Sequence, residues 1–131
     1  MRQTFKMIRK NIFSILVALL LLYLSLANPE KFAESELIRI PNIDKIIHFG
    51  MYFLMMSVII IEHRKSIKNP VNLLLLALIP LSYGVLLEIL QLTLTSNRSA
   101  DFYDALFDAA GTMTSVLLWF LIKPAVKKQV R

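Results

Sequence analysis

The sequence predicts an all-α polytopic membrane protein, a bundle of four transmembrane helices that forms a single domain over residues 1–131. Two observations support this prediction. AVILMFWYC residues make up 56% of the chain and charged residues 18%, whereas soluble domains average about 25% charged residues. The apolar residues also gather in four long runs without the alternation of apolar and polar positions that marks the strands of a membrane barrel.

Composition excludes several classes of protein. The chain has no cysteine, so disulfides, zinc–thiolate sites and thiol catalysis are excluded. Its net charge of +6 comes from Lys and Arg residues that flank the apolar runs. The predicted partner of these charges is therefore the surface of a lipid bilayer, and no nucleic acid is expected.

The four helices are expected at approximately residues 11–29, 43–62, 69–95 and 102–122. Each run comes close to the length of about 20 residues that a membrane-spanning helix needs. The first run is uncharged, and the core of each later run has one residue of the His, Asp or Glu type. These residues are His48, Glu88 and Asp108, in chain order. The connections between the runs are short, which leaves no room for a soluble domain.

The first run allows two interpretations. A basic segment precedes it, and it ends in Ser25-Leu26-Ala27, a pattern of small residues found at signal-peptide cleavage sites. On that interpretation, residues 1–27 are a cleaved signal peptide. The apolar stretch is slightly long for a signal peptide, which favours a retained first helix. Cleavage would leave the orientation of the other helices unchanged.

Lys and Arg predict the orientation of the chain. Eleven of them lie before the first helix, between the second and third helices, and after the fourth helix. Only four lie in the other two loops. Because positive residues favour the cytoplasmic side of a membrane, both termini are predicted to be cytoplasmic.

Polar residues form stripes on three of the predicted helices. Residues three or four positions apart share one face of a helix, and the stripes all lie near the predicted outer surface. We expect them to line a shallow cavity that opens to the outside. The stripes are Asp44, His48 and Tyr52 in the second helix, Glu88 and Gln91 in the third, and Asp104, Asp108 and Gly111 in the fourth.

Several of these polar and small residues also have structural interpretations. Asp101 is placed to cap the fourth helix, and Asn42 and Asp44 to cap the second, because side-chain oxygens accept hydrogen bonds from the first free N–H groups of a helix. Gly111 and Ser115 are four residues apart, and such pairs of small residues let membrane helices pack closely. These roles do not exclude a function for the same residues.

Glu88 and Asp108 are difficult to explain by structure alone. A charge within a membrane helix costs about 2.5–3.5 kcal/mol on insertion scales, and such residues usually face a bundle interior or a water-filled cavity. Two acids in one site also repel each other, so at least one must hold a proton or a cation. The compensating charge can come from Arg98, Lys45, His48 or a divalent metal ion.

The ordered motifs resemble those of the VanZ-like family of small bacterial membrane proteins. They are Asp44-Lys45-Ile46-Ile47-His48-Phe49, Glu88-Ile89-Leu90-Gln91, Arg98, and the segment from Asp104 to Gly111. The chain departs from the family pattern at Asp108, where the family usually has Asn, and at Ser115, where it usually has Gly. The resemblance implies a role in the cell envelope and a place in the plasma (inner) membrane of a bacterium.

Binding of an anionic lipid head group is the first functional hypothesis. The ligand would be a phospholipid or a lipid-linked cell-wall precursor, with basic residues on its phosphate. The acids and amides would orient polar groups or a cation. The predicted ligand-binding residues are Asp44, Lys45, His48, Tyr52, Glu88, Gln91, Arg98, Asp101, Asp104 and Asp108.

Two other hypotheses remain open. The chain can be a membrane enzyme in which His48, paired with Asp44, is the general base and Glu88 the acid. In a variant of this hypothesis, Glu88, Asp104 and Asp108 hold a divalent cation such as Mg²⁺. Alternatively, the chain is a non-catalytic subunit whose polar stripes join the four helices while a protein partner does the work.

Overall fold

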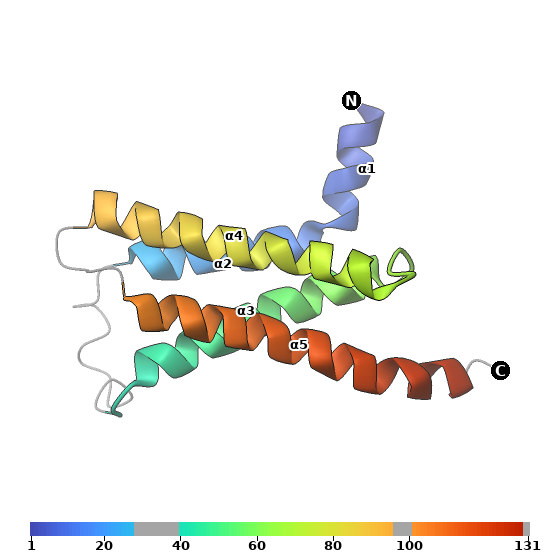
Figure 1. Ribbon diagram of the computed structural model, residues 1–131. Coiled ribbons are helices and arrows are strands. Elements are labelled where there is room, and N and C mark those ends of the chain that lie inside the picture. The colour runs from blue at the N-terminus through green and yellow to red at the C-terminus, as the bar shows by residue number, and fades with distance from the viewer. Residues whose placement is uncertain (28–39, 96–100, 130–131) are drawn as a thin grey trace.

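The computed structural model describes residues 1–27, 40–95 and 101–129, and every regular element within these ranges is a helix (Figure 1). The helices are α1 (Arg2–Lys10), α2 (Ile12–Leu26), α3 (Ile43–His63), α4 (Pro70–Leu94) and α5 (Phe102–Gln129). The predicted all-α class is confirmed, and the predicted bounds of the second and third helices agree with α3 and α4 to within one residue. The fourth helix begins at Phe102 as predicted, but α5 continues to Gln129, beyond the predicted end at residue 122.

Three helices are long and apolar enough to cross a membrane: α3, α4 and the part of α5 over Phe102–Lys123. A fourth span is counted only if α1 and α2 form one bent unit. The 15 residues of α2 rise about 22 Å, which is less than the hydrocarbon core of about 30 Å. The membrane-spanning helices are therefore three or four in number.

The start of the chain differs from the prediction. The sequence predicts a single helix over 11–29, but the structure has a separate helix, α1, before it, and the two helices are bent by 68° at Asn11. Residues 28 and 29 lie outside the described ranges. Lys, Arg and Gln are good helix formers, and Arg9 and Lys10 in the last turn of α1 interact favourably with the helix dipole. A helix at residues 2–10 is therefore consistent with local propensity.

A residue of α3 holds the start of α2. Glu62, in the last turn of α3, accepts hydrogen bonds from the N–H groups of Phe13 at 2.8 Å and Ser14 at 3.3 Å, and from the Ser14 hydroxyl. Asn11 occupies the N-cap position of α2, but its side chain makes no capping hydrogen bond. Glu62 thus satisfies free N–H groups at the start of α2 from another helix.

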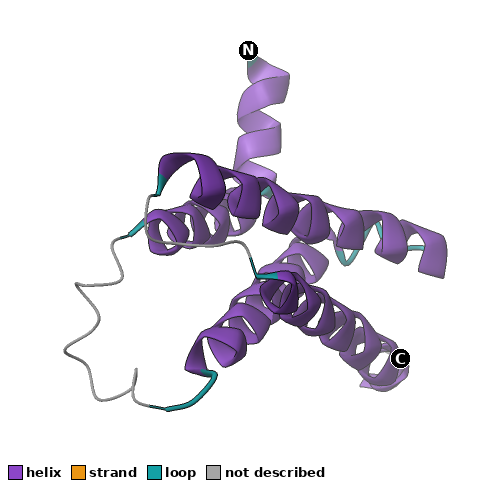
Figure 2. Ribbon diagram, turned by 60° about the vertical axis from the view of Figure 1, so that its left-hand side comes forward, coloured by secondary structure: helices purple, strands orange, loops and turns teal. Residues whose placement is uncertain are grey.

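The core forms around α3, which contacts α2, α4 and α5 (Figure 2). Gly111 permits the close approach of α5, because a Cβ atom at this position would meet the carbonyl oxygen of Phe49 and lie 3.0 Å from the nitrogen of Phe53. One turn further along α5, the hydroxyl oxygens of Ser115 and Ser57 are 2.8 Å apart. The predicted packing role of Gly111 and Ser115 is confirmed.

The helix caps agree with the sequence in part. Asp101 caps α5 as predicted, because its Oδ1 accepts a hydrogen bond of 2.9 Å from the N–H of Tyr103. The prediction for Asn42 was wrong. Asn42 precedes α3 with a left-handed φ of 58°, and its side chain makes no capping hydrogen bond. Its carbonyl accepts instead from the N–H of Lys45 at 3.1 Å.

A candidate polar site where α3, α4 and α5 meet

The predicted stripes meet at one end of the bundle. The beginnings of α3 and α5 and the end of α4 lie at the same end of the molecule (Figure 1). His48 is five residues after the start of α3, Asp108 six residues after the start of α5, and Glu88 six residues before the end of α4. At a rise of about 1.5 Å per residue, all three residues lie about 8–9 Å inside the helix ends.

His48 lies between two acids of α5. Its Nδ1 is 2.8 Å from Oδ1 of Asp108, and its Nε2 is 3.8 Å from Oδ2 of Asp104. Asp108 is buried, whereas His48 and Asp104 are half-buried. The acid that pairs with His48 is thus Asp108, and not Asp44, which contacts Lys45.

Gly84 of α4 provides space for two polar groups. A Cβ atom at Gly84 would lie 3.1 Å from Oδ2 of Asp108 and 3.2 Å from the hydroxyl oxygen of Tyr52. Because glycine has no side chain, the carboxylate and the buried tyrosine reach the surface of α4 at this point. The sequence analysis missed Gly84, although a glycine one helical turn before Glu88 in an apolar run is a visible signal.

Glu88 completes a group of three possible metal ligands. Its Oε2 is buried and has no hydrogen-bond partner among the described residues. Within the described ranges, ligand atoms of His48, Glu88 and Asp108 all lie within 4.8 Å of one another. Imidazole nitrogen and carboxylate oxygen are ligands that divalent cations accept. Two of the three predicted metal ligands, Glu88 and Asp108, belong to this group. The third, Asp104, lies beside the group, and His48 is the third possible ligand instead.

Lys45 joins α3 to the start of α5. Its Nζ is 3.2 Å from Asp44, 3.3 Å from Asp101 and 3.9 Å from Asp104. The hydrogen bond from the Tyr103 N–H, and next the one from Lys45, hold the pKa of Asp101 below its ordinary value, against the opposing effect of desolvation. Lys45 is therefore already surrounded by carboxylates.

The structure does not place two of the predicted site residues in this cluster. Gln91 is buried, and its Nε2 donates a hydrogen bond of 3.0 Å to the carbonyl of Ser25 on α2, so its amide joins α4 to α2. Arg98 lies outside the described residues.

Acids outnumber bases in the part of the cluster that the structure describes. There is one lysine, Lys45, and one histidine, His48. Such an excess of carboxylates favours a cation as the group that binds directly. The carboxylates are those of Asp44, Glu88, Asp101, Asp104 and Asp108.

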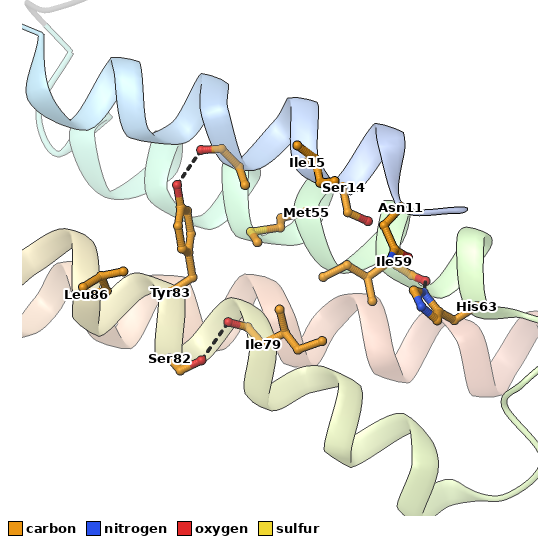
Figure 3. A pocket seen from close by; sticks show the side chains of 11 residues that line it. Asn11, Ser14, Ile15, Met55, Ile59, His63, Ile79, Ser82, Tyr83 and Leu86 are labelled. Atoms are coloured by element: carbon orange, nitrogen blue, oxygen red, sulfur yellow. Dashed lines mark hydrogen bonds between the residues drawn. The ribbon is translucent and has the colours of Figure 1, made fainter. Parts of the chain in front are cut away.

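A separate cavity of about 530 Å³ lies between α2, α3 and α4, towards the other end of the bundle (Figure 3). Its lining is mostly apolar, with Asn11, Ser14 and His63 gathered at one end. Tyr83 borders the cavity and donates a hydrogen bond of 2.6 Å to the carbonyl of Ala18. None of the predicted site residues lines this cavity, so it is distinct from the polar cluster.

The motifs that predicted the cluster also agree with the comparison to known proteins. Residues 2–123 match the VanZ/LLP1 family. The chain belongs to the VanZ/LLP1 family. No curated protein and no solved structure matches it. The motif residues from Asp44 to Gly111 all lie within the matched range.

Proposed function

We propose that this VanZ/LLP1 protein acts in the envelope of a bacterium, in the plasma membrane, with both termini in the cytoplasm. The polar cluster then faces the outer side and binds the anionic head group of a lipid through a divalent cation. The observation that supports this proposal is the group of His48, Glu88 and Asp108, whose ligand atoms lie within 4.8 Å of one another in a cluster rich in carboxylates.

The excess of acid explains why a cation is needed. A phosphate that entered the cluster alone would face the carboxylates of Glu88, Asp104 and Asp108, and like charges repel. A divalent cation on the three ligands neutralises part of this charge. It also has coordination positions left for phosphate oxygens, as Mg²⁺ does when one or two carboxylates and a substrate phosphate bind it together.

The chemical class of the ligand follows from the same argument. Phospholipids and lipid-linked cell-wall precursors both present a phosphate next to apolar chains. Lys45 lies between α3 and α5, nearer to the helix ends than His48. It donates to Asp44 and Asp101, and because an ammonium group has three donors, its third is proposed to contact such a phosphate. We therefore take a lipid phosphate as the ligand of the cluster.

A second candidate function is supported by the contact between His48 and Asp108. A histidine oriented by a buried carboxylate at 2.8 Å is a common arrangement for a general base. On this alternative the chain is an enzyme that acts on the same lipid, and turnover of the lipid phosphate distinguishes it from binding alone.

Native mass spectrometry of the full-length protein tests the binding proposal. Purified protein is titrated with phosphatidylglycerol in the presence of Mg²⁺ or of EDTA. We expect one bound lipid per chain that EDTA removes, and a loss of this EDTA-sensitive lipid by about tenfold or more in the Glu88→Gln variant, as expected for damage to a metal site. Glu36→Gln, which removes a carboxylate from the first predicted loop, serves as the control and should bind as the wild type does.

Two results would overturn the proposal. The first is lipid retention that is equal with Mg²⁺ and with EDTA in the wild type and in Glu88→Gln. The second is an equal loss in Glu88→Gln and Glu36→Gln, because the effect would then reflect general charge and not the three ligands.

A further inference from the structure

The bend between α1 and α2 forms a second feature of the molecule, at the end opposite to the polar cluster. The helix α1 leaves the bundle at 68° (Figure 1). Lys6 shares one side of α1 with Arg9 and Lys10, which follow it by three and four positions. Phe5 and Ile8, which are 73% and 47% exposed, lie beside this basic side. A short basic helix with an apolar side is typical of a segment that lies in the surface of a membrane.

A hollow of about 650 Å³ lies at this bend. Three of its five lining residues are apolar, Phe5, Ile8 and Ile12, and the other two are Lys6 and Arg9. The hollow therefore combines an apolar surface with two positive groups, in the place where the chain passes from a basic helix to the uncharged helix α2.

We propose that this hollow binds one anionic phospholipid from the leaflet on the N-terminal side of the membrane. The phosphate contacts Lys6 and Arg9 in charge-assisted hydrogen bonds, and the start of an acyl chain lies on Phe5, Ile8 and Ile12. The apolar side chains favour a lipid over a free phosphate, because a small soluble anion would leave them in contact with water.

The position of Glu62 fixes one part of the site. Its carboxylate accepts hydrogen bonds from the N–H groups of Phe13 and Ser14 and so fixes the start of α2 against α3. Ile12, the lining residue that belongs to α2, lies directly before this point in the chain. Its backbone is therefore held before the lipid arrives, which reduces the entropy cost of binding.

Native mass spectrometry in EDTA tests the proposal on the full-length protein, since EDTA removes the contribution of any metal-dependent site. The probe is phosphatidylglycerol, with phosphatidylcholine for comparison. The double variant Lys6→Gln/Arg9→Gln should bind phosphatidylglycerol with an affinity about 30-fold lower than that of the wild type. This factor is the typical contribution of two cations to binding at a lipid surface. The control Lys65→Gln/Lys68→Gln removes two cations between α3 and α4, at the same end of the bundle, and should bind as the wild type does.

A second variant and a competitor test the lipid part of the proposal. Ile8→Gln keeps both cations and should also weaken phosphatidylglycerol retention several-fold. Soluble glycerophosphate should not displace the lipid. The proposal is overturned if the two double variants lose equal amounts of lipid, if Ile8→Gln binds as the wild type does, or if glycerophosphate competes as well as the lipid. Because the test is made in EDTA, its failure is distinguishable from failure of the metal-dependent site.

Discussion

Asp108 is the residue that brings the polar cluster together. One of its oxygens is 2.8 Å from Nδ1 of His48, and the other faces Gly84 of α4, as the hydroxyl of Tyr52 does. A buried carboxylate in this position pairs α5 with α3 and lies against α4. It also provides an oxygen to the group of three possible metal ligands.

Asp101 leads to a prediction about pH. Its pKa is lowered in the folded chain, so its contribution to stability is present above the pKa of the unfolded chain, about 3.9, and is lost as the pH falls through the folded value. Asp101→Asn keeps a capping side chain but loses the ion pair with Lys45. The wild type should therefore unfold at a higher temperature than Asp101→Asn above about pH 5, and the difference should shrink as the pH falls below about 3.9.

Thermal unfolding of both proteins in detergent, followed by circular dichroism, measures this difference. A difference that stays constant over the whole pH range would show that the charge of Asp101 has no role in stability.

At the scale of the helices, the packing of α5 on α3 depends on Gly111. A Cβ atom there would meet backbone atoms of Phe49 and Phe53, and backbone atoms cannot move aside as a flexible side chain can. Gly111→Ala should therefore separate the two helices and lower the free energy of unfolding by about 1–3 kcal/mol, as is typical of overpacking.

Gly50→Ala is the matched control, because a Cβ atom at Gly50 meets nothing within 4 Å. This variant should keep or gain stability, since alanine favours a helix over glycine by about 1 kcal/mol. Denaturation of both variants in mixed detergent measures the two effects. Equal stability of Gly111→Ala and Gly50→Ala would contradict the close contact.

The helices that the sequence predicts well are those with local signals. Asn69, which caps α4, is followed by Pro70 at the first position of the helix, and Asp101 caps α5. The exact start of α2 was not predictable from such signals, because the group that satisfies its first N–H groups, Glu62, is 49 residues from Phe13 in the chain. Contacts between distant segments depend on packing, which a single sequence does not display.

The same limit applies to the site. Helical spacing places His48, Glu88 and Asp108 on stripes, and the antiparallel order of the helices brings these stripes to one end. Spacing along one helix also places Asp44 one turn before His48, which suggested that those two residues pair. The structure pairs His48 of α3 with Asp108 of α5. This pairing depends on how α5 is rotated about its axis and how far it is shifted along α3, and the spacing within one helix does not specify either.

At the scale of the whole molecule, the two ends of the bundle differ in charge. The polar cluster, rich in carboxylates, lies where α3 and α5 begin. The opposite end has the basic helix α1 and, between α3 and α4, Lys65 and Lys68. This distribution agrees with a cytoplasmic N-terminus under the positive-inside rule, and it defines the proposed orientation.

Single-cysteine labelling tests this orientation, and the natural chain has no cysteine to interfere. In intact bacterial cells, a membrane-impermeant maleimide should label Asp44→Cys, whose side chain is 58% exposed in the structure. It should label Lys65→Cys only after the cells are opened. The reverse pattern would place the polar cluster on the cytoplasmic side and would contradict the proposed orientation.

In the proposed function, His48, Glu88 and Asp108 together hold one divalent cation. Titration of the purified protein with Mn²⁺, followed by electron paramagnetic resonance of the free ion, measures this most directly. We expect one bound Mn²⁺ per chain in the wild type and in Glu36→Gln, and a loss of affinity of about tenfold or more in Asp108→Asn. Absence of bound Mn²⁺ in the wild type, or equal affinity in Asp108→Asn, would contradict this proposal.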